Sequence, residues 1–298
     1  MAQLHICLLG DMQATWDNGR QLRLPPAAEA LFSYLVLFQN RSHRREVLAD
    51  LFWKERPYNK ARRCLSTTLW RLKRELADSV SCLDTSSFGG VKFENLRLHW
   101  VDAVAFEKKA VLALSHPVSS MGDEDIIILE EATQLYRGQL LEDYYDEWVL
   151  QERERLNLLY LRCLGRLMRY HRHQRNWAKS ILYGQKILLV DPLREQVHRE
   201  LIQLHSENGQ RSLAVQQYEF CRRILQNELG IEPMMETQAV YQHAMGQIQR
   251  SSSAAMLHRG ELTEPLLQKI DAVMMELVQA QEQLRSIREQ VLLSQLGE

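Results

Sequence analysis

The residues of this sequence that are best suited to chemistry are arginines. The stretch from Arg41 to Arg74 holds 11 basic and 3 acidic residues, a net charge of +8, in a chain whose formal net charge is -1. Guanidinium groups bind phosphates and can donate paired hydrogen bonds to guanine edges. A local basic excess in an otherwise neutral protein is therefore typical of a polyanion-binding surface. A solvated helix face is the alternative interpretation.

A helix predicted from about residue 59 to residue 77 must position these side chains. Its apolar residues recur at spacings of four, four, three and four, which predicts a buried stripe. The stripe consists of Ala61, Leu65, Leu69, Leu72 and Leu76. The opposite face carries Arg63, Thr67, Trp70, Arg71 and Arg74. Its arginines and threonine could contact base edges or phosphates. We expect Trp70 to pack against a following hairpin instead of reading DNA.

The elements around this helix predict a winged helix-turn-helix. Short strands are expected over Leu4–Leu8 and Gln21–Leu24, and an apolar helix over Ala27–Phe38. Ser42 is the predicted N-cap of a second helix. Alternating residues from 80 to 98, around a Gly-Gly tip, predict a hairpin. Strands, three helices and a terminal hairpin are the element order of this fold, whose third helix enters the major groove.

Two further groups of basic residues are expected to touch DNA. Arg41, Arg44 and Arg45 lie near a predicted helix N-terminus, where a phosphate is favourably bound. Lys92 lies beside the Gly-Gly tip and is a predicted wing contact.

The chain from Asp102 onward is predicted to be helical, with Asp102 and Asp123 as N-caps. A long helix from about residue 146 to 173 is followed by four more, over residues 177–190, 193–208, 211–228 and 235–249. Tyr183 and Tyr218 lie 35 residues apart, each following a small residue, Ala178 or Ala214. This spacing resembles tetratricopeptide helix pairs. The overall fold class predicted is mainly α, with a small α+β domain at the N-terminus.

The last predicted element is a coiled-coil helix. Apolar residues at alternating spacings of four and three form a heptad seam, typical of a dimeric coiled coil. The seam consists of Leu266, Ile270, Val273, Leu277, Ala280, Leu284, Ile287 and Val291. We therefore expect a homodimer. A helix folded back onto the preceding domain is the alternative.

Several function classes are disfavoured by what the sequence lacks. The longest mostly apolar stretch, residues 30–38, is far shorter than the roughly 20 residues of a membrane helix. Five scattered cysteines predict neither disulfides nor a zinc site. Phosphate-loop, nucleophile-elbow and zinc-protease motifs are missing. We expect a cytoplasmic protein that is not an enzyme, binds no cofactor or metal, and does not associate with a membrane.

Ordered pieces of both halves together resemble one family. In the first half these pieces are Leu4–Gly10, Arg45–Trp53, Ala61–Leu65, Leu69–Leu76, Thr85–Phe93 and Val101–Glu107. In the second half they are Tyr136–Gly138, Glu147–Trp148, Asp191–Glu195 with His198, and Leu229–Pro233. Over about residues 3–247 the chain resembles the SARP-type transcriptional activators, which join an OmpR-like winged helix to a bacterial transcriptional activator domain.

The resemblance implies the DNA-reading residues and the partners. Carried over by position, the reading residues are Arg62, Arg63, Ser66, Thr67, Trp70, Arg71 and Arg74. Double-stranded DNA with repeated promoter sites and RNA polymerase are the implied partners. Cys64, Ser66, Thr67 and Trp70 differ from the usual family types, and the phosphate loop of larger members is missing. A helical-repeat adaptor whose winged domain does not read DNA is the alternative function.

The predicted organisation is a winged helix over residues 1–100, an activator domain over 101–250, a linker over 251–263 and the coiled-coil helix over 264–298. If the heptad seam dimerises, removing residues 264–298 should give a monomer with weaker DNA binding. Light scattering measures the mass directly. An unchanged mass would show that this interpretation of the seam is wrong.

Overall fold

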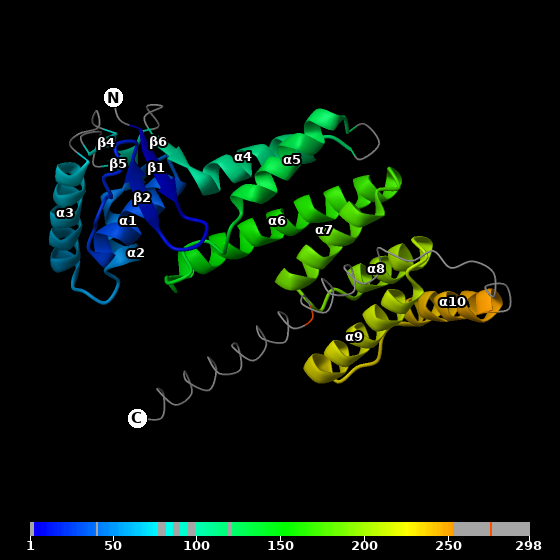
Figure 1. Cartoon of the computed structure of the whole chain (residues 1–298). Helices are drawn as coiled ribbons and strands as arrows, with labels where there is room; N and C mark the ends of the chain where they lie inside the picture. Colours follow the sequence, from blue (N-terminus) through cyan, green and yellow to red (C-terminus); the bar gives the residue numbers. More distant parts are fainter. Residues whose placement is uncertain are drawn as a thin grey trace. The chain divides into compact units, whose positions relative to one another are not determined.

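A computed structural model describes residues 3–39, 41–76, 82–85, 90–94, 99–117, 121–252 and 275 (Figure 1). The chain forms two compact units, Met1–Tyr170 and a second that begins at His171. The first unit contains every described strand, and the second is built from helices. The fold is mainly helical, as predicted.

The described strands of the first unit form two small sheets. They are β1 (Leu4–Cys7), β2 (Gln13–Trp16), β3 (Ser42–Arg44), β4 (Leu83–Asp84), β5 (Gly90–Phe93) and β6 (His99–Val101). In one sheet β1 is central, antiparallel to β2 and parallel to β6. In the other, β5 pairs antiparallel with both β3 and β4. The β4–β5 pair is the predicted hairpin.

Two of the local predictions in this region are wrong. The second strand lies over Gln13–Trp16, and the predicted strand Gln21–Leu24 contributes only an isolated bridge from Gln21 to Thr15. Ser42 does not cap a helix, because it begins β3 and pairs with Lys92 of β5. In both cases strand pairing decided the conformation: β2 pairs with the neighbouring β1, and Ser42 pairs with the distant β5. Local sequence signals do not report such partners.

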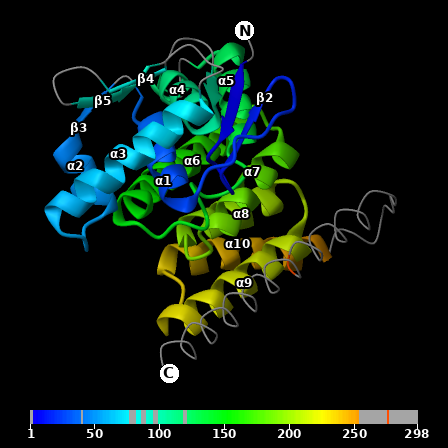
Figure 2. The ribbon, with the colours of Figure 1, turned by 90° about the vertical axis from the view of Figure 1, so that its left-hand side faces the viewer.

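Six helices begin in the first unit. They are α1 (Pro26–Leu37), α2 (Arg45–Phe52), α3 (Tyr58–Glu75), α4 (Asp102–Leu114), α5 (Asp123–Leu135) and α6 (Glu147–His173), all within the described residues. Figure 1 shows α3 on one side of the strands and α4 with α5 on the other. Viewed from that side, α3 lies in front of α1 (Figure 2). The position of α3 leaves one long side of this helix open.

The buried side chain of Asp102 joins the first strand to the helical part of this unit. Its carboxylate accepts hydrogen bonds from the backbone N–H groups of Leu8 at 2.7 Å and Leu9 at 3.0 Å. It also accepts one from Ala103 at 2.6 Å. Asp102 is the first residue of α4 and not its N-cap, which is Val101. Burial nevertheless raises the pKa of the Asp102 carboxyl, outweighing these hydrogen bonds.

The segment before α6 continues this connection. The N–H of Leu141 donates to the carbonyl of Leu8 at 2.9 Å, and the N–H of Gly10 donates to Gln139 at 2.8 Å. A Cβ on Gly138 would lie 3.1 Å from the Cα of Gly10, so the close approach of these two backbone segments favours glycine there. Arg153 of α6 donates to the Leu140 carbonyl at 2.9 Å.

Aromatic side chains pack the start of α6 against the winged helix. Trp148 lies edge-on to Tyr34 of α1, with ring centroids 5.1 Å apart, and it also contacts Phe52 of α2. The hydroxyl of Tyr144 donates to Glu29 at 2.6 Å. Contacts with α1 and α2 therefore determine how α6 leaves the winged helix.

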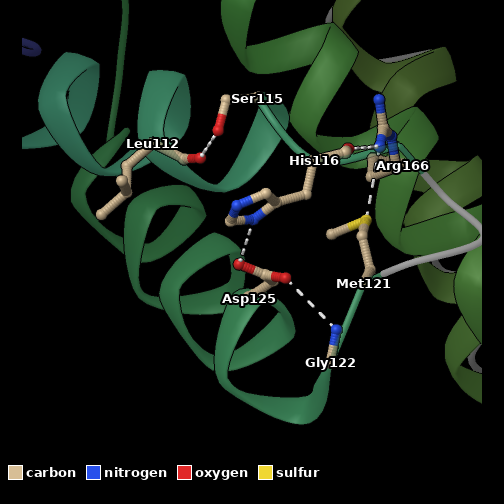
Figure 3. A network of polar contacts seen from close by, with 7 residues as sticks. All are labelled: Leu112, Ser115, His116, Met121, Gly122, Asp125 and Arg166. Atoms are coloured by element: carbon tan, nitrogen blue, oxygen red, sulfur yellow. Dashed lines mark hydrogen bonds and ion pairs between the residues drawn. The ribbon is translucent and has the colours of Figure 1, made fainter.

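A polar network positions α5 beside α6 (Figure 3). Arg166 donates to the carbonyl of His116 at 2.6 Å, and the His116 ring lies 2.9 Å from Asp125. This ring contact lowers the pKa of the Asp125 carboxyl. Asp123 is not the N-cap of α5, since that residue is Gly122, and its carboxylate instead accepts from the Tyr170 hydroxyl at 2.9 Å.

The second unit stacks antiparallel helices in the manner of tetratricopeptide repeats. They are α7 (Trp177–Val190), α8 (Glu195–Glu207), α9 (Arg211–Leu229) and α10 (Met235–Ser252). Tyr218 stacks on Tyr241 with ring centroids 4.0 Å apart, beside the fully buried Ala214. Gly230 ends α9 in the left-handed conformation at φ 67°, which accounts for the predicted break there.

One of the two predicted aromatic and small-residue pairs is wrong. Tyr183 is buried and stacks on His171, with centroids 5.6 Å apart. Ala178, however, is exposed, and the small buried residues of α7 are Ser180 and Gly184. Residue spacing correctly identified Tyr183 as a packing residue, but it did not predict that the Ala178 side chain points to solvent.

The end of the chain is described only in part. α10 extends through Ser252, two residues into the predicted linker. The heptad seam lies outside the described residues, so the predicted coiled coil and homodimer remain predictions. Among the helices of the described residues, none is long and apolar enough to cross a membrane.

The Asp102 contacts predict a large loss of stability on truncation. Asp102→Ala leaves buried N–H groups without an acceptor, and each unsatisfied group costs about 1–3 kcal/mol. We expect a loss of about 3–5 kcal/mol in the free energy of unfolding, measured by urea denaturation. Asp102→Asn keeps one acceptor oxygen and should lose less. Equal stability of the alanine variant and the wild type would contradict this role.

Candidate nucleic-acid interface

The buried side of α3 agrees with the prediction from spacing. All five stripe residues are buried, and Leu72 is completely so. Thr68 is also buried, which the apolar pattern did not indicate. The stripe packs α3 against α1 and α2, and it fixes which side chains point outward.

The outward side of α3 gathers the residues that the resemblance implies. All seven are exposed: Arg62, Arg63, Ser66, Thr67, Trp70, Arg71 and Arg74. We call this set the α3 face. Arg62, Arg63 and Arg71 form no ion pair with any residue that the structure describes. Three positive charges without an ion-pair partner among the described residues thus lie on one exposed helix.

Trp70 is open instead of packed against the described strands of the hairpin, so the expectation of a packed tryptophan is wrong for this part of the chain. Its side chain is 60% exposed, and the guanidinium of Arg74 lies 5.0 Å from its ring centroid. Leu69 is buried, and the next residue of a helix lies about 100° further around its axis, so the Trp70 side chain points away from the core. Arg74 also donates to Glu75 at 3.0 Å, so its guanidinium is held between a ring and a carboxylate.

A second aromatic and arginine pair lies at the start of α3. Tyr58 is 58% exposed, and the guanidinium of Arg62 lies 5.5 Å from its ring. Tyr58 was not singled out from the sequence. The signal was present as an aromatic residue four positions before an arginine, the same spacing as Trp70 and Arg74.

Two further arginines, Arg44 and Arg45, lie at the start of α2. Arg45 is the first residue of α2, and its guanidinium donates to the Ser66 hydroxyl at 3.1 Å. That hydroxyl in turn donates to the Arg62 carbonyl at 3.0 Å. Arg44 is exposed at the N-cap position without a capping side chain. The structure therefore joins Arg45 to the α3 face and leaves Arg44 beside the open N–H groups of a helix start.

The predicted wing residue is partly neutralised. Lys92 lies in β5, half-buried, and its ammonium group forms an ion pair with Glu94 at 3.0 Å. Lys73 of α3, which was not singled out from the sequence, donates to the Thr85 hydroxyl at 2.6 Å. This bond connects α3 to the hairpin.

A separate hollow in the second unit contains an arginine that already has partners. It has a volume of about 440 Å³, with Arg172 and His243 in its wall. Arg172 donates to Gln203 at 3.2 Å and to Glu207 at 2.9 Å. The positive charge of Arg172 is therefore balanced by Glu207 within the hollow, whereas three arginines of the α3 face have no ion-pair partner among the described residues.

A winged helix with an exposed basic third helix is followed here by a tetratricopeptide-like helical region. Residues 101–245 match the bacterial transcriptional activator domain. The chain therefore contains a bacterial transcriptional activator domain preceded by a winged helix. In this order of parts it is similar to the SARP-type transcriptional regulators.

Individual relatives agree with this assignment. The chain is 26% identical to regulatory protein AfsR of Streptomyces coelicolor over 81% of its own length. It spans about a quarter, 24%, of AfsR. It is 23% identical to transcriptional regulatory protein MoaR1 of Mycobacterium bovis, covering 82% of this chain and 81% of MoaR1.

A solved structure supports the fold. Mycobacterium tuberculosis EmbR in complex with a low affinity phosphopeptide superposes with a TM-score of 0.68 at 20% identity. The match covers 83% of this chain and 66% of the EmbR chain.

Proposed function

We propose that this protein is a sequence-specific DNA-binding activator of transcription whose α3 face reads the major groove. The observation that carries the proposal is the exposed α3 face, with three arginines that lack ion-pair partners among the described residues. The family assignment and the names of its relatives as regulators support the same function.

The dimensions of α3 suit the proposed contact. Its 18 residues give a length of about 27 Å, and the major groove admits one α-helix. Arg63 and Arg71 lie on its outward side and have the fork geometry that recognises guanine. Arg44, at the start of α2, would bind a phosphate, as would Arg45 and Lys92 if they leave their present partners.

Contact with RNA polymerase and assembly as a homodimer are further parts of the proposal. The family resemblance supports the polymerase contact, and the heptad seam over residues 266–291 supports the dimer. We propose no catalytic activity and no cofactor for this chain.

Selection of bound sequences from random duplex DNA, with affinity then followed against salt, tests the proposal. We expect an enriched motif and a log-log salt slope of about -0.9 for each phosphate neutralised. The spacing and symmetry of the motif would also report how two subunits are arranged. A folded protein that enriches no motif would favour the adaptor function.

Arg71 provides a residue-level test. We expect Arg71→Ala to weaken binding to the selected motif by about 1–3 kcal/mol and to relax specificity at one position, if Arg71 meets a base edge. Binding to the motif and to single-base variants can be measured by fluorescence anisotropy.

The matched control for this variant is Arg223→Ala. Arg223 is an exposed arginine of α9 without an ion pair among the described residues. Its replacement by alanine removes the same charge, but from the second unit. It should leave binding nearly unchanged. An equal loss for Arg71→Ala on every sequence would show a phosphate contact and contradict base reading.

A further inference from the structure

The α3 face holds a large apolar side chain at the point where polar readers are expected. With 3.6 residues per turn, Trp70 points about 150° away from the mean direction of the buried residues of α3. Arg63, Thr67 and Arg74 all lie within about 60° of it around the helix axis. Trp70 is therefore near the centre of the α3 face, and not at its margin.

The arrangement of the indole leaves it open to a ligand. The ring is 60% exposed even with the Arg74 guanidinium lying 5.0 Å from its centroid. Arg74 is also bonded to Glu75, so the cation is held at a defined place beside the ring. Tryptophan is enriched among the residues that dominate binding energies at interfaces.

The chemistry of duplex DNA limits what this indole can meet. Among the base edges of the major groove, the C5-methyl group of thymine is the apolar feature, while the other edge groups are hydrogen-bond donors and acceptors. An apolar side chain at the centre of a groove-entering face therefore has thymine as its matching partner.

We infer that Trp70 is a specificity-determining residue that contacts the methyl group of a thymine in the recognised site. The inference rests on the proposed function. The guanidinium of Arg74 lies beside the indole and is held there by the ring and by Glu75. Thr67 lies one turn earlier on the same side of the helix and does not replace the indole, because its side chain is much shorter.

Replacing thymine by uracil tests the contact, because it removes the methyl group and leaves every hydrogen-bonding group in place. In the motif recovered by selection, each invariant thymine is replaced in turn by uracil, and affinity is measured for full-length protein. We expect one replacement to weaken wild-type binding about fourfold, the effect of burying one methyl group. Trp70→Ala should bind thymine and uracil versions equally, and Trp70→Phe should retain part of the preference.

Tyr58→Ala is the matched control. It removes an equally exposed aromatic residue that also lies against an arginine, about 18 Å along α3 and about 120° around it. This variant should keep the fourfold preference for thymine. Circular dichroism of each variant establishes that α3 is intact, as expected for changes at exposed positions.

The possible results separate this inference from the proposed function. A motif without an invariant thymine, or a uracil effect of equal size in wild type and Trp70→Ala, overturns the role of Trp70 while DNA reading stands. A uniform loss in Trp70→Ala without any uracil effect indicates a contact from the indole N–H to a phosphate, and it also overturns the role. Failure to enrich any motif overturns both.

Discussion

The first unit depends on one buried carboxylate. Asp102 accepts from the N–H groups of Leu8 and Leu9, at the end of β1, while it begins α4. A buried charge without partners would be costly, and so would the buried N–H groups without an acceptor. The carboxylate gains hydrogen-bond donors, and the N–H groups gain an acceptor. These hydrogen bonds hold the first strand of the winged helix to the first helix of the activator domain. The residues that they join lie 93 or 94 positions apart in the chain.

Further contacts around Asp102 extend this junction over a wider surface. The backbone near Gly10 accepts and donates hydrogen bonds with residues 139–142, and Arg153 satisfies carbonyls of the same segment. Trp148 then packs α6 against α1 and α2. The winged helix is accordingly part of a compact unit that reaches Tyr170, with α3 left open on the side away from α4 and α5.

The charge of the α3 face follows from what surrounds it. Arg155, on α6 of the same unit, is paired with Glu107 and Glu152. Arg62, Arg63 and Arg71 have no such partners among the described residues, and the net charge of +8 over residues 41–74 is concentrated near them. Like charges on one helix destabilise it by a few tenths of a kcal/mol per pair, so a polyanion would relieve this repulsion.

The sequence by itself determined the helices and the two sides of α3. Leu65, Leu69 and Leu72 repeat with the helical period, and this local regularity is enough to predict which neighbours point outward. The heptad seam is equally readable, but it lies outside the described residues. Only the tertiary structure decided that Ser42 begins a strand, that Trp70 is open and that Arg45 reaches Ser66. Strand partners and side-chain contacts of this kind come from residues far apart in the chain, and no local period encodes them.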